Sequence, residues 1–225
     1  MIFELDARLS DSPFVDQVWQ ARSVRSGMLH SIASNYFMMV VTLRDGKSTF
    51  TVRGPETKAT PLFCDADGEW MGINFRVGAF MPHLPVRALV DRDLTLPGVG
   101  ERSFCLDGTA WQFPNYENAD TFVDRLVREG LLVREPVVDV VLQGQLSDVS
   151  TRSVQRRFVR ATGLTRKAIQ QIERARTAMT LLQRGVSILD TVHEAGYCDQ
   201  PHLTRSLKRL LGQTPAEIVG STTLE

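Results

Sequence analysis

The sequence predicts an α+β protein, with a small and mainly antiparallel β domain in residues 1–115 and an all-α domain in residues 116–225. Two observations predict this division. Apolar residues form short, strand-like runs in the first half and recur at helical spacing in the second half. Basic residues are concentrated in the second half. With 225 residues, of which 43% are hydrophobic, the chain is long enough to bury a core in each half.

The first half contains runs of β-branched, aromatic and methionine residues that are separated by turn signals. Residues 36–43 and 48–52 are two such runs, and Asp45-Gly46 lies between them, so we predict a β-hairpin here. Residues 61–77 predict a second hairpin around the turn Asp65–Gly68. Short strands at this spacing favour a small antiparallel sheet or barrel.

The second half contains short helices with capping residues at their starts and glycine at their ends. Ser187 precedes Asp190 by three residues, and Thr214 precedes Glu217 by three, which is the spacing of a capping box. Asp199 precedes a helix with Pro201 in its first turn. We therefore predict helices over residues 119–130, 136–144, 150–162, 165–184, 187–196 and 199–212, and from residue 214 onward.

The net charge of zero hides one concentrated basic block. Residues 147–212 contain 12 Lys and Arg against 5 Asp and Glu, whereas residues 1–118 contain 11 against 14. Such a block indicates a surface that meets a polyanion, although a solvated basic helix surface would have the same composition.

Composition and motifs argue against several classes of protein. No apolar run approaches the roughly 18 residues that span a bilayer, and the first six residues lack the pattern of a secretory signal. The cysteines, Cys64, Cys105 and Cys198, form no metal-ligand or disulfide pattern, as expected in a reducing cytoplasm. No residues stand in a catalytic pattern. We expect a cytoplasmic protein that is not an enzyme, uses no metal or cofactor and does not enter a membrane.

Residues 153–165 and 202–214 form an internal repeat. A repeat of this length implies two copies of one supersecondary unit. The matching pairs are Val154 with Leu203, Arg156 with Arg205, Phe158 with Leu207, Arg160 with Arg209, Ala161 with Leu210, Gly163 with Gly212 and Thr165 with Thr214.

A helical wheel gives both copies an apolar stripe and a basic outer face. In the second copy Arg205 points away from a stripe formed by Leu203, Leu207, Leu210 and Leu211. In the first copy the outward ladder consists of Arg152, Arg156 and Arg160. A short helix, a tight turn and a capped basic helix form a helix-turn-helix, whose second helix enters the DNA major groove.

Two such units, joined by the helix over residues 165–184, would reach successive major-groove segments roughly 34 Å apart. The alternative is a helical bundle in which both basic faces are only solvated.

Two stretches of the sequence resemble AraC/XylS-type transcription regulators. Residues 150–163 resemble the first recognition helix of that family, and residues 195–215 resemble its second helix-turn-helix signature with the Thr-Pro that follows. The resemblance implies two helix-turn-helix units on a linker helix, a regulatory N-terminal domain, and promoter or operator DNA as the partner. A homodimer and RNA polymerase are further candidate partners.

Motif position carries DNA contacts over to residues of both recognition helices. With Arg160 and Lys208 added from the basic faces, the candidate DNA-binding residues are Arg152, Gln155, Arg156, Arg160, Gln200, Pro201, His202, Thr204, Arg205 and Lys208. The turn over residues 143–149, before the first recognition helix, is longer than the family pattern and lacks its Ala-xxx-Gly form.

Aromatic and methionine residues of the first half could line an effector pocket or form an ordinary core. As pocket residues they would suit a hydrophobic or planar cationic compound. The candidate effector-binding residues are Trp19, Phe37, Met39, Trp70, Phe75 and His83.

We therefore expect a sequence-specific DNA-binding transcription regulator that receives a small-molecule effector or a partner at its N-terminal domain. The alternative is a small-molecule-binding protein whose helical half is a dimerisation module or a nonspecific DNA binder.

Overall fold

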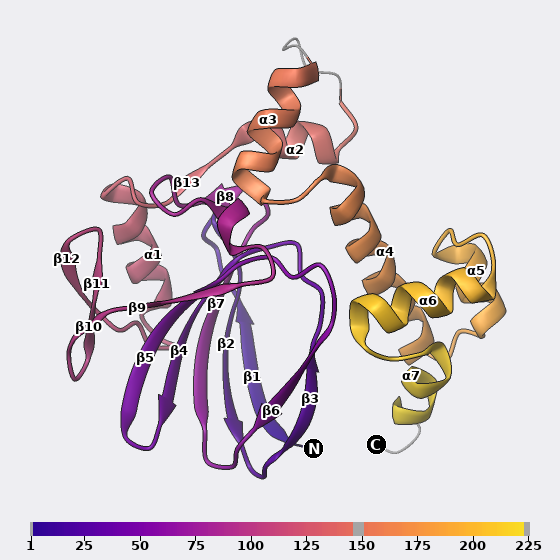
Figure 1. Ribbon diagram of the computed structural model, residues 1–225, viewed down its shortest axis with the longest axis horizontal. Helices are drawn as coiled ribbons and strands as arrows, with labels where there is room; N and C mark the ends of the chain where they lie inside the picture. The colour runs from indigo at the N-terminus through magenta and orange to yellow at the C-terminus, as the bar shows by residue number, and fades with distance from the viewer. Residues whose placement is uncertain (1, 146–150, 223–225) are drawn as a thin grey trace. The chain divides into compact units, whose positions relative to one another are not determined.

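The computed structural model describes residues 2–145 and 151–222 (Figure 1). It confirms the predicted fold class, because antiparallel strands fill most of the first half and helices fill most of the second half. Contacts divide the chain into two compact units. Unit 1 comprises Met1–Met28, Tyr36–Pro55 and Phe63–Thr165, and unit 2 comprises Leu29–Asn35, Glu56–Leu62 and Arg166–Glu225.

Unit 1 is built on a six-stranded antiparallel sheet. Its strands, in spatial order, are β1 (Phe3–Leu9), β2 (Val15–Ser23), β7 (Glu69–Phe75), β4 (Met38–Arg44), β5 (Lys47–Arg53) and β9 (Asp93–Leu96). Three smaller sheets consist of β10 (Gly98–Gly100), β11 (Ser103–Leu106) and β12 (Thr109–Gln112); of β13 (Val133–Arg134) and β8 (Ala79–Phe80); and of β3 (Gly27–Ser31) and β6 (Thr60–Cys64). A short 3₁₀ helix, η1, spans Val86–Leu89.

The first predicted hairpin is confirmed. Strands β4 and β5 pair from Met38↔Arg53 to Arg44↔Lys47. The two turn residues, Asp45 and Gly46, both have positive φ, at 51° and 72°, as the tight hairpin turn requires.

The second predicted hairpin is wrong, although both of its strands exist. Strand β6 pairs with β3, and β7 lies between β2 and β4. Residues 71–75 of β7 are all buried, which suits a central strand whose two edges are already paired.

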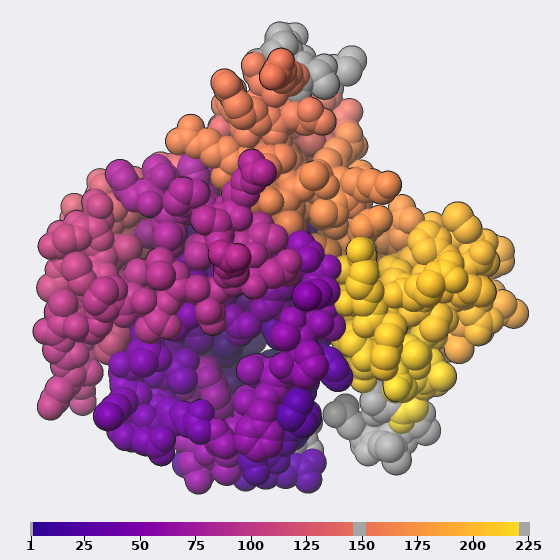
Figure 2. Space-filling model, in the orientation of Figure 1, coloured from indigo at the N-terminus to yellow at the C-terminus, as the bar shows by residue number. Residues whose placement is uncertain are grey.

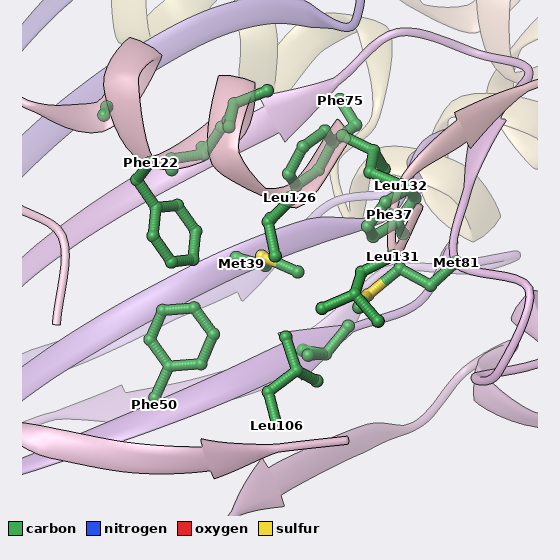
Figure 3. Close-up of a cluster of buried hydrophobic side chains, with 14 of the residues drawn as sticks. Phe37, Met39, Phe50, Phe75, Met81, Leu106, Phe122, Leu126, Leu131 and Leu132 are labelled. Carbon is green, nitrogen blue, oxygen red and sulfur yellow. The ribbon is translucent and has the colours of Figure 1, made fainter. Parts of the chain in front are cut away.

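Helix α1 (Ala119–Arg128) packs into the core of unit 1. Figure 3 shows Phe122 and Leu126 of α1 among side chains of the sheet, with Phe50 and Met39 close by. The ring of Phe50 also stacks on Phe104, with the ring centroids 4.0 Å apart. The contacts thus group this helix with the strands. The predicted boundary between a domain over residues 1–115 and a domain over residues 116–225 stays a prediction.

The remaining helices begin and end close to the predicted residues. They are α2 (Pro136–Leu142), α3 (Thr151–Thr162), α4 (Arg166–Gln183), α5 (Ile188–Glu194), α6 (Gln200–Leu211) and α7 (Pro215–Thr222). The predicted capping box at α7 is present, since Glu217 N donates to Thr214 Oγ1 at 3.3 Å and Thr214 N donates to Glu217 Oε2 at 2.6 Å. None of the helices in the described part of the chain is long and apolar enough to cross a membrane.

Two short segments from the first half of the chain complete unit 2. The last carbonyls of a helix have no partner inside the helix. In α6 two of them are satisfied by these segments: Ala33 N donates to Leu210 O, and Ala59 N donates to Arg209 O, both at 2.8 Å. Asn35 Nδ2 also donates to Glu173 Oε1 on α4, at 3.0 Å. The end of α6 is therefore held by residues 150 and 177 positions earlier in the sequence.

Candidate nucleic-acid interface

Helix α6 is fixed at its start, along its inner face and at its end. The Asp199 carboxylate accepts a hydrogen bond from His202 N at 2.6 Å, which is the predicted N-cap. Gly212 ends the helix with a φ of 77°. The predicted apolar stripe is confirmed, because all four of its side chains are at most 1% exposed: Leu203, Leu207, Leu210 and Leu211.

The turn between α5 and α6 is joined to α6 by Tyr197. Its hydroxyl lies 3.1 Å from Ser206 Oγ, and its ring packs edge-on against the ring of His202, with centroids 5.1 Å apart. Burial raises the pKa of the Tyr197 phenol, against the opposing effects of the Ser206 hydrogen bond and the charge of Arg174. The phenol is therefore a neutral hydrogen-bonding group that fixes the angle between the two helices.

The outer face of α6 is open to solvent. Figure 2 shows the C-terminal helices, in yellow, as an open part of the molecular surface. Four of the candidate residues are exposed and two are half-buried: the exposed ones are Gln200, Pro201, Arg205 and Lys208, and the half-buried ones are His202 and Thr204. Lys208 lies 3.5 Å from the Glu217 carboxylate. Arg205 pairs with no carboxylate among the described residues.

Helix α3 presents the first candidate set in a similar way. Arg152, Gln155, Arg156 and Arg160 are all exposed, whereas Phe158 and Ala161 are buried. Val154, which the helical wheel places in the buried stripe, is only half-buried. The guanidinium of Arg160 lies over the ring of Phe80, 5.8 Å from its centroid. The long turn over residues 143–149 and the start of the helix at Ser150 fall largely outside the described residues.

An ion pair that the sequence did not reveal anchors α3 to the start of α2. Arg157 donates to the Glu135 carboxylate at 2.6 and 3.0 Å. Burial of this carboxylate opposes its ionisation, but hydrogen bonds from Arg157 and from Val137 N outweigh the burial and hold the pKa of Glu135 below its usual value. Glu135 also caps α2 through Val137 N.

The candidate effector-binding residues are spread over unit 1. Phe37, Met39 and Phe75 are at most 3% exposed and form part of the core, where the rings of Phe37 and Phe75 stack with centroids 4.4 Å apart. Trp19 is half-buried and donates from Nε1 to Asn74 Oδ1. His83 is exposed. These five do not line the cavity that Trp70 lines.

That cavity has a volume of about 590 Å³. Its lining combines apolar side chains, four carboxylates and one cation. The apolar side chains include Leu5, Val41, Leu43, Trp70 and Met71, and the carboxylates are Glu4, Asp6, Glu69 and Glu117. The cation is Arg22, whose Nε lies 3.9 Å from Glu69 Oε1.

Comparison with known proteins identifies the C-terminal part of the chain. Residues 145–220 match the family model of a helix-turn-helix domain. These residues are a helix-turn-helix domain of the AraC type. The match confirms a helix-turn-helix domain in the part of the chain where the sequence predicts DNA binding.

Among solved structures, ToxT from Vibrio cholerae is similar to the chain. The P21 crystal form has 10% sequence identity and a TM-score of 0.41, and the comparison covers 98% of each chain. ToxT from strain O395 bound to (E)-4-(8-methylnaphthalen-1-yl)but-3-enoic acid has 9% identity and a TM-score of 0.40, with 99% of this chain and 100% of that chain covered. A likeness at these values assigns neither the fold nor the ligand of ToxT to this chain. No curated protein sequence matches the chain.

Proposed function

We propose that this chain is an AraC-type regulator in which α3 and α6 each enter the major groove of one DNA duplex. The observation that carries the proposal is the geometry of α6. Its apolar stripe is buried and its start is capped, while Arg205 on its outer face is exposed and without a carboxylate partner in the described part of the chain. A rigid helix with a free arginine on its outer face suits the readout of base edges.

The roles of the exposed residues follow from their chemistry. Arg156 on α3 and Arg205 on α6 occupy matching positions of the repeat. An arginine can donate two parallel hydrogen bonds to O6 and N7 of guanine, so we assign base readout to this pair. Contacts to phosphate groups are assigned to the other arginines of the two helices and to Lys208. The surrounding contacts to the duplex are assigned to the remaining candidate residues, which are Arg152, Gln155, Arg160, Gln200, Pro201, His202, Thr204 and Lys208.

Regulation enters through the first half of the chain, taken as residues 1–115, while residues 116–225 bind DNA. The cavity of about 590 Å³ that Trp70 lines is the place that we propose for an effector. Its four carboxylates outnumber its one cation, Arg22, so the lining is complementary to a planar or hydrophobic compound with a positive charge. Such a compound would act by favouring one arrangement of the chain, and so one DNA affinity. A second copy of the chain and RNA polymerase are further proposed partners.

The test is a selection from random DNA duplexes on the full chain at near-physiological salt. The double variant Arg156→Ala/Arg205→Ala is compared with a control of equal charge, Arg25→Ala/Arg102→Ala, whose arginines are exposed in unit 1 and lie within residues 1–115. We expect a motif with two elements about one helical turn apart. It should be selected by the wild type and the control and be lost in the variant.

Two results would contradict the proposal. Recovery of the same motif by the Arg156→Ala/Arg205→Ala variant would show that these arginines do not read bases. A wild-type chain that binds all duplexes alike, with an affinity that falls steeply as salt is added, would be the nonspecific binder.

A further inference from the structure

Helix α4 carries a polar strip that its position between two helix-turn-helix units does not explain. The strip consists of residues at spacing i, i+3, i+4 and i+7, which lie on one face of a helix: Lys167, Gln170, Gln171 and Arg174. Packing inside unit 2 is supplied by other residues of the helix, such as Ile169, Ile172 and Ala175, which are at most 2% exposed.

Helix α6 carries a second strip with the same spacing, formed by His202, Arg205, Ser206 and Arg209. The two strips, together with Tyr197, line one cavity of about 470 Å³, which we call the α4–α6 groove. Arg209 donates to Gln171 Oε1 across this groove at 3.2 Å. The two polar strips therefore form the two sides of one groove.

The α4–α6 groove contains four positive charges and no carboxylate in its lining. The cations are Lys167, Arg174, Arg205 and Arg209. In the described part of the chain none of the four is paired with an acidic side chain. Arg174 lies over the ring of Tyr197, 5.6 Å from its centroid, and Arg209 is bonded to a neutral amide. The nearest acidic residue of α4 in sequence, Glu173, accepts its hydrogen bond from Asn35.

Four cations that line one cavity repel one another, and an anion that enters the cavity offsets this repulsion. Arginine and lysine together favour phosphate, because a guanidinium donates two parallel hydrogen bonds to a phosphate and an ammonium adds a compact charge. Neutral donors complete the lining, namely the amides of Gln170 and Gln171 and the hydroxyl of Ser206. The groove thus has the chemistry of a phosphate site.

We propose that the α4–α6 groove binds a phosphate group, and that in the complex with DNA this is a phosphate of the duplex backbone. The inference rests on the proposed function, because Arg205 and His202 belong both to the groove and to the DNA-facing side of α6. Helix α4 is then a DNA-contacting element in addition to a connection. Lys167 and Arg174 fix the position of α6 on the duplex and read no bases.

The experiment uses the full chain and the double variant Lys167→Gln/Arg174→Gln. Arg25→Gln/Arg102→Gln removes the same charge at exposed positions of unit 1 within residues 1–115 and is the control. Affinity is measured by fluorescence anisotropy for the selected duplex and for a scrambled duplex over a series of salt concentrations. Near-UV circular dichroism verifies that both variants keep the wild-type fold.

We expect the α4 variant to bind both duplexes about tenfold more weakly, by a similar factor for each, because phosphate contacts carry no sequence information. The slope of log affinity against log salt should fall by about 0.9 for each phosphate contact that is lost. If the wild type binds DNA and the α4 variant keeps the affinity and salt slope of the control, the inference is overturned and the proposed function stands.

A second arm separates DNA from free phosphate as the source of the anion. Inorganic phosphate and pyrophosphate are titrated into the wild type and the α4 variant by calorimetry. If the wild type binds neither duplex but binds pyrophosphate, and the α4 variant does not, then the groove is a phosphate site for a free ligand and the proposed function fails. If the wild type binds neither DNA nor these anions, the inference is overturned as well.

Discussion

Replacing Gly212 by alanine tests whether an N-terminal segment packs against the end of the recognition helix α6. Gly212 has a φ of 77°, and a Cβ placed there would lie 2.7 Å from Cγ and Cδ2 of His30 and 3.2 Å from its Cβ. His30 belongs to Leu29–Asn35, one of the two early segments of unit 2. Because the contact reaches the root of the imidazole, turning the ring about χ2 cannot relieve it.

The cost has two parts that a matched glycine separates. Alanine in the left-handed region costs about 1–2 kcal/mol in any context. Gly185 at the end of α4 has a φ of 83°, and no atom in the described part of the chain would lie within 4 Å of a Cβ placed there. Gly185→Ala should therefore lose only this amount of stability. Forcing an extra methyl group into a packed site costs about 1–3 kcal/mol more. Gly212→Ala should therefore destabilise the chain by about 2–5 kcal/mol.

The assay is urea unfolding followed by near-UV circular dichroism, on both single variants and on His30→Ala alone and combined with Gly212→Ala. The double-mutant cycle should return a coupling energy of about 1 kcal/mol or more, since removing the ring removes the collision. Equal losses at Gly212 and Gly185, unchanged by His30→Ala, would refute the packing of residues 29–35 against α6.

Three further predictions concern the cap, the core and an ion pair. Asp199→Ala should lower the stability by about 1 kcal/mol, because the His202 N–H loses the carboxylate that accepts its hydrogen bond at 2.6 Å. Asp199→Asn keeps a capping side chain and should retain most of the wild-type stability in thermal unfolding. Equal losses of stability for the two variants would exclude capping. Leu207→Ala leaves a cavity at a side chain that is 0% exposed, so it should lower the free energy of unfolding in urea by about 2–5 kcal/mol. Arg205→Ala should change that free energy by less than about 0.5 kcal/mol. A similar loss for both variants would contradict the orientation of α6. The folded-state pKa of Glu135 lies below its usual 4.5, so the stabilisation by Arg157 is fully present above pH 4.5 and is lost as the pH falls through the lower folded value. Glu135→Gln should flatten this acid limb of stability against pH, and an unchanged limb would disprove the assignment.

Most element boundaries of the second half could be predicted because their determinants are local. Asp199 caps α6 through an atom three residues along the chain, and Gly212 ends the helix through its own backbone angle. The buried face of α6 also follows from spacing, since a helix has one period whatever surrounds it. The hairpin at Asp45-Gly46 was predictable for the same reason, because the turn fixes the pairing of its two strands.

The wrong hairpin, and the choice between pocket and core that the sequence left open, both depend on residues far apart in the sequence. The turn at Asp65–Gly68 is a sound local signal, yet β7 pairs with β2 and β4, which compete for both of its edges. Phe37, Met39 and Phe75 have a composition that suits a pocket or a core, and only the face of the sheet that they occupy places them in the core. Residues 36–39 and 71–75 do not contain that information by themselves.

The sequence by itself determined the fold class, the helix-turn-helix region, the approximate ends of most helices and the basic outer faces of α3 and α6. Tertiary structure alone decided that α1 packs with the strands, that residues 29–35 and 56–62 hold the end of α6, and that the polar strips of α4 and α6 line one groove. The physical reason is the range of the interactions. Caps, turns and helical period act within a few residues, whereas strand pairing and side-chain packing join residues that lie far apart along the chain.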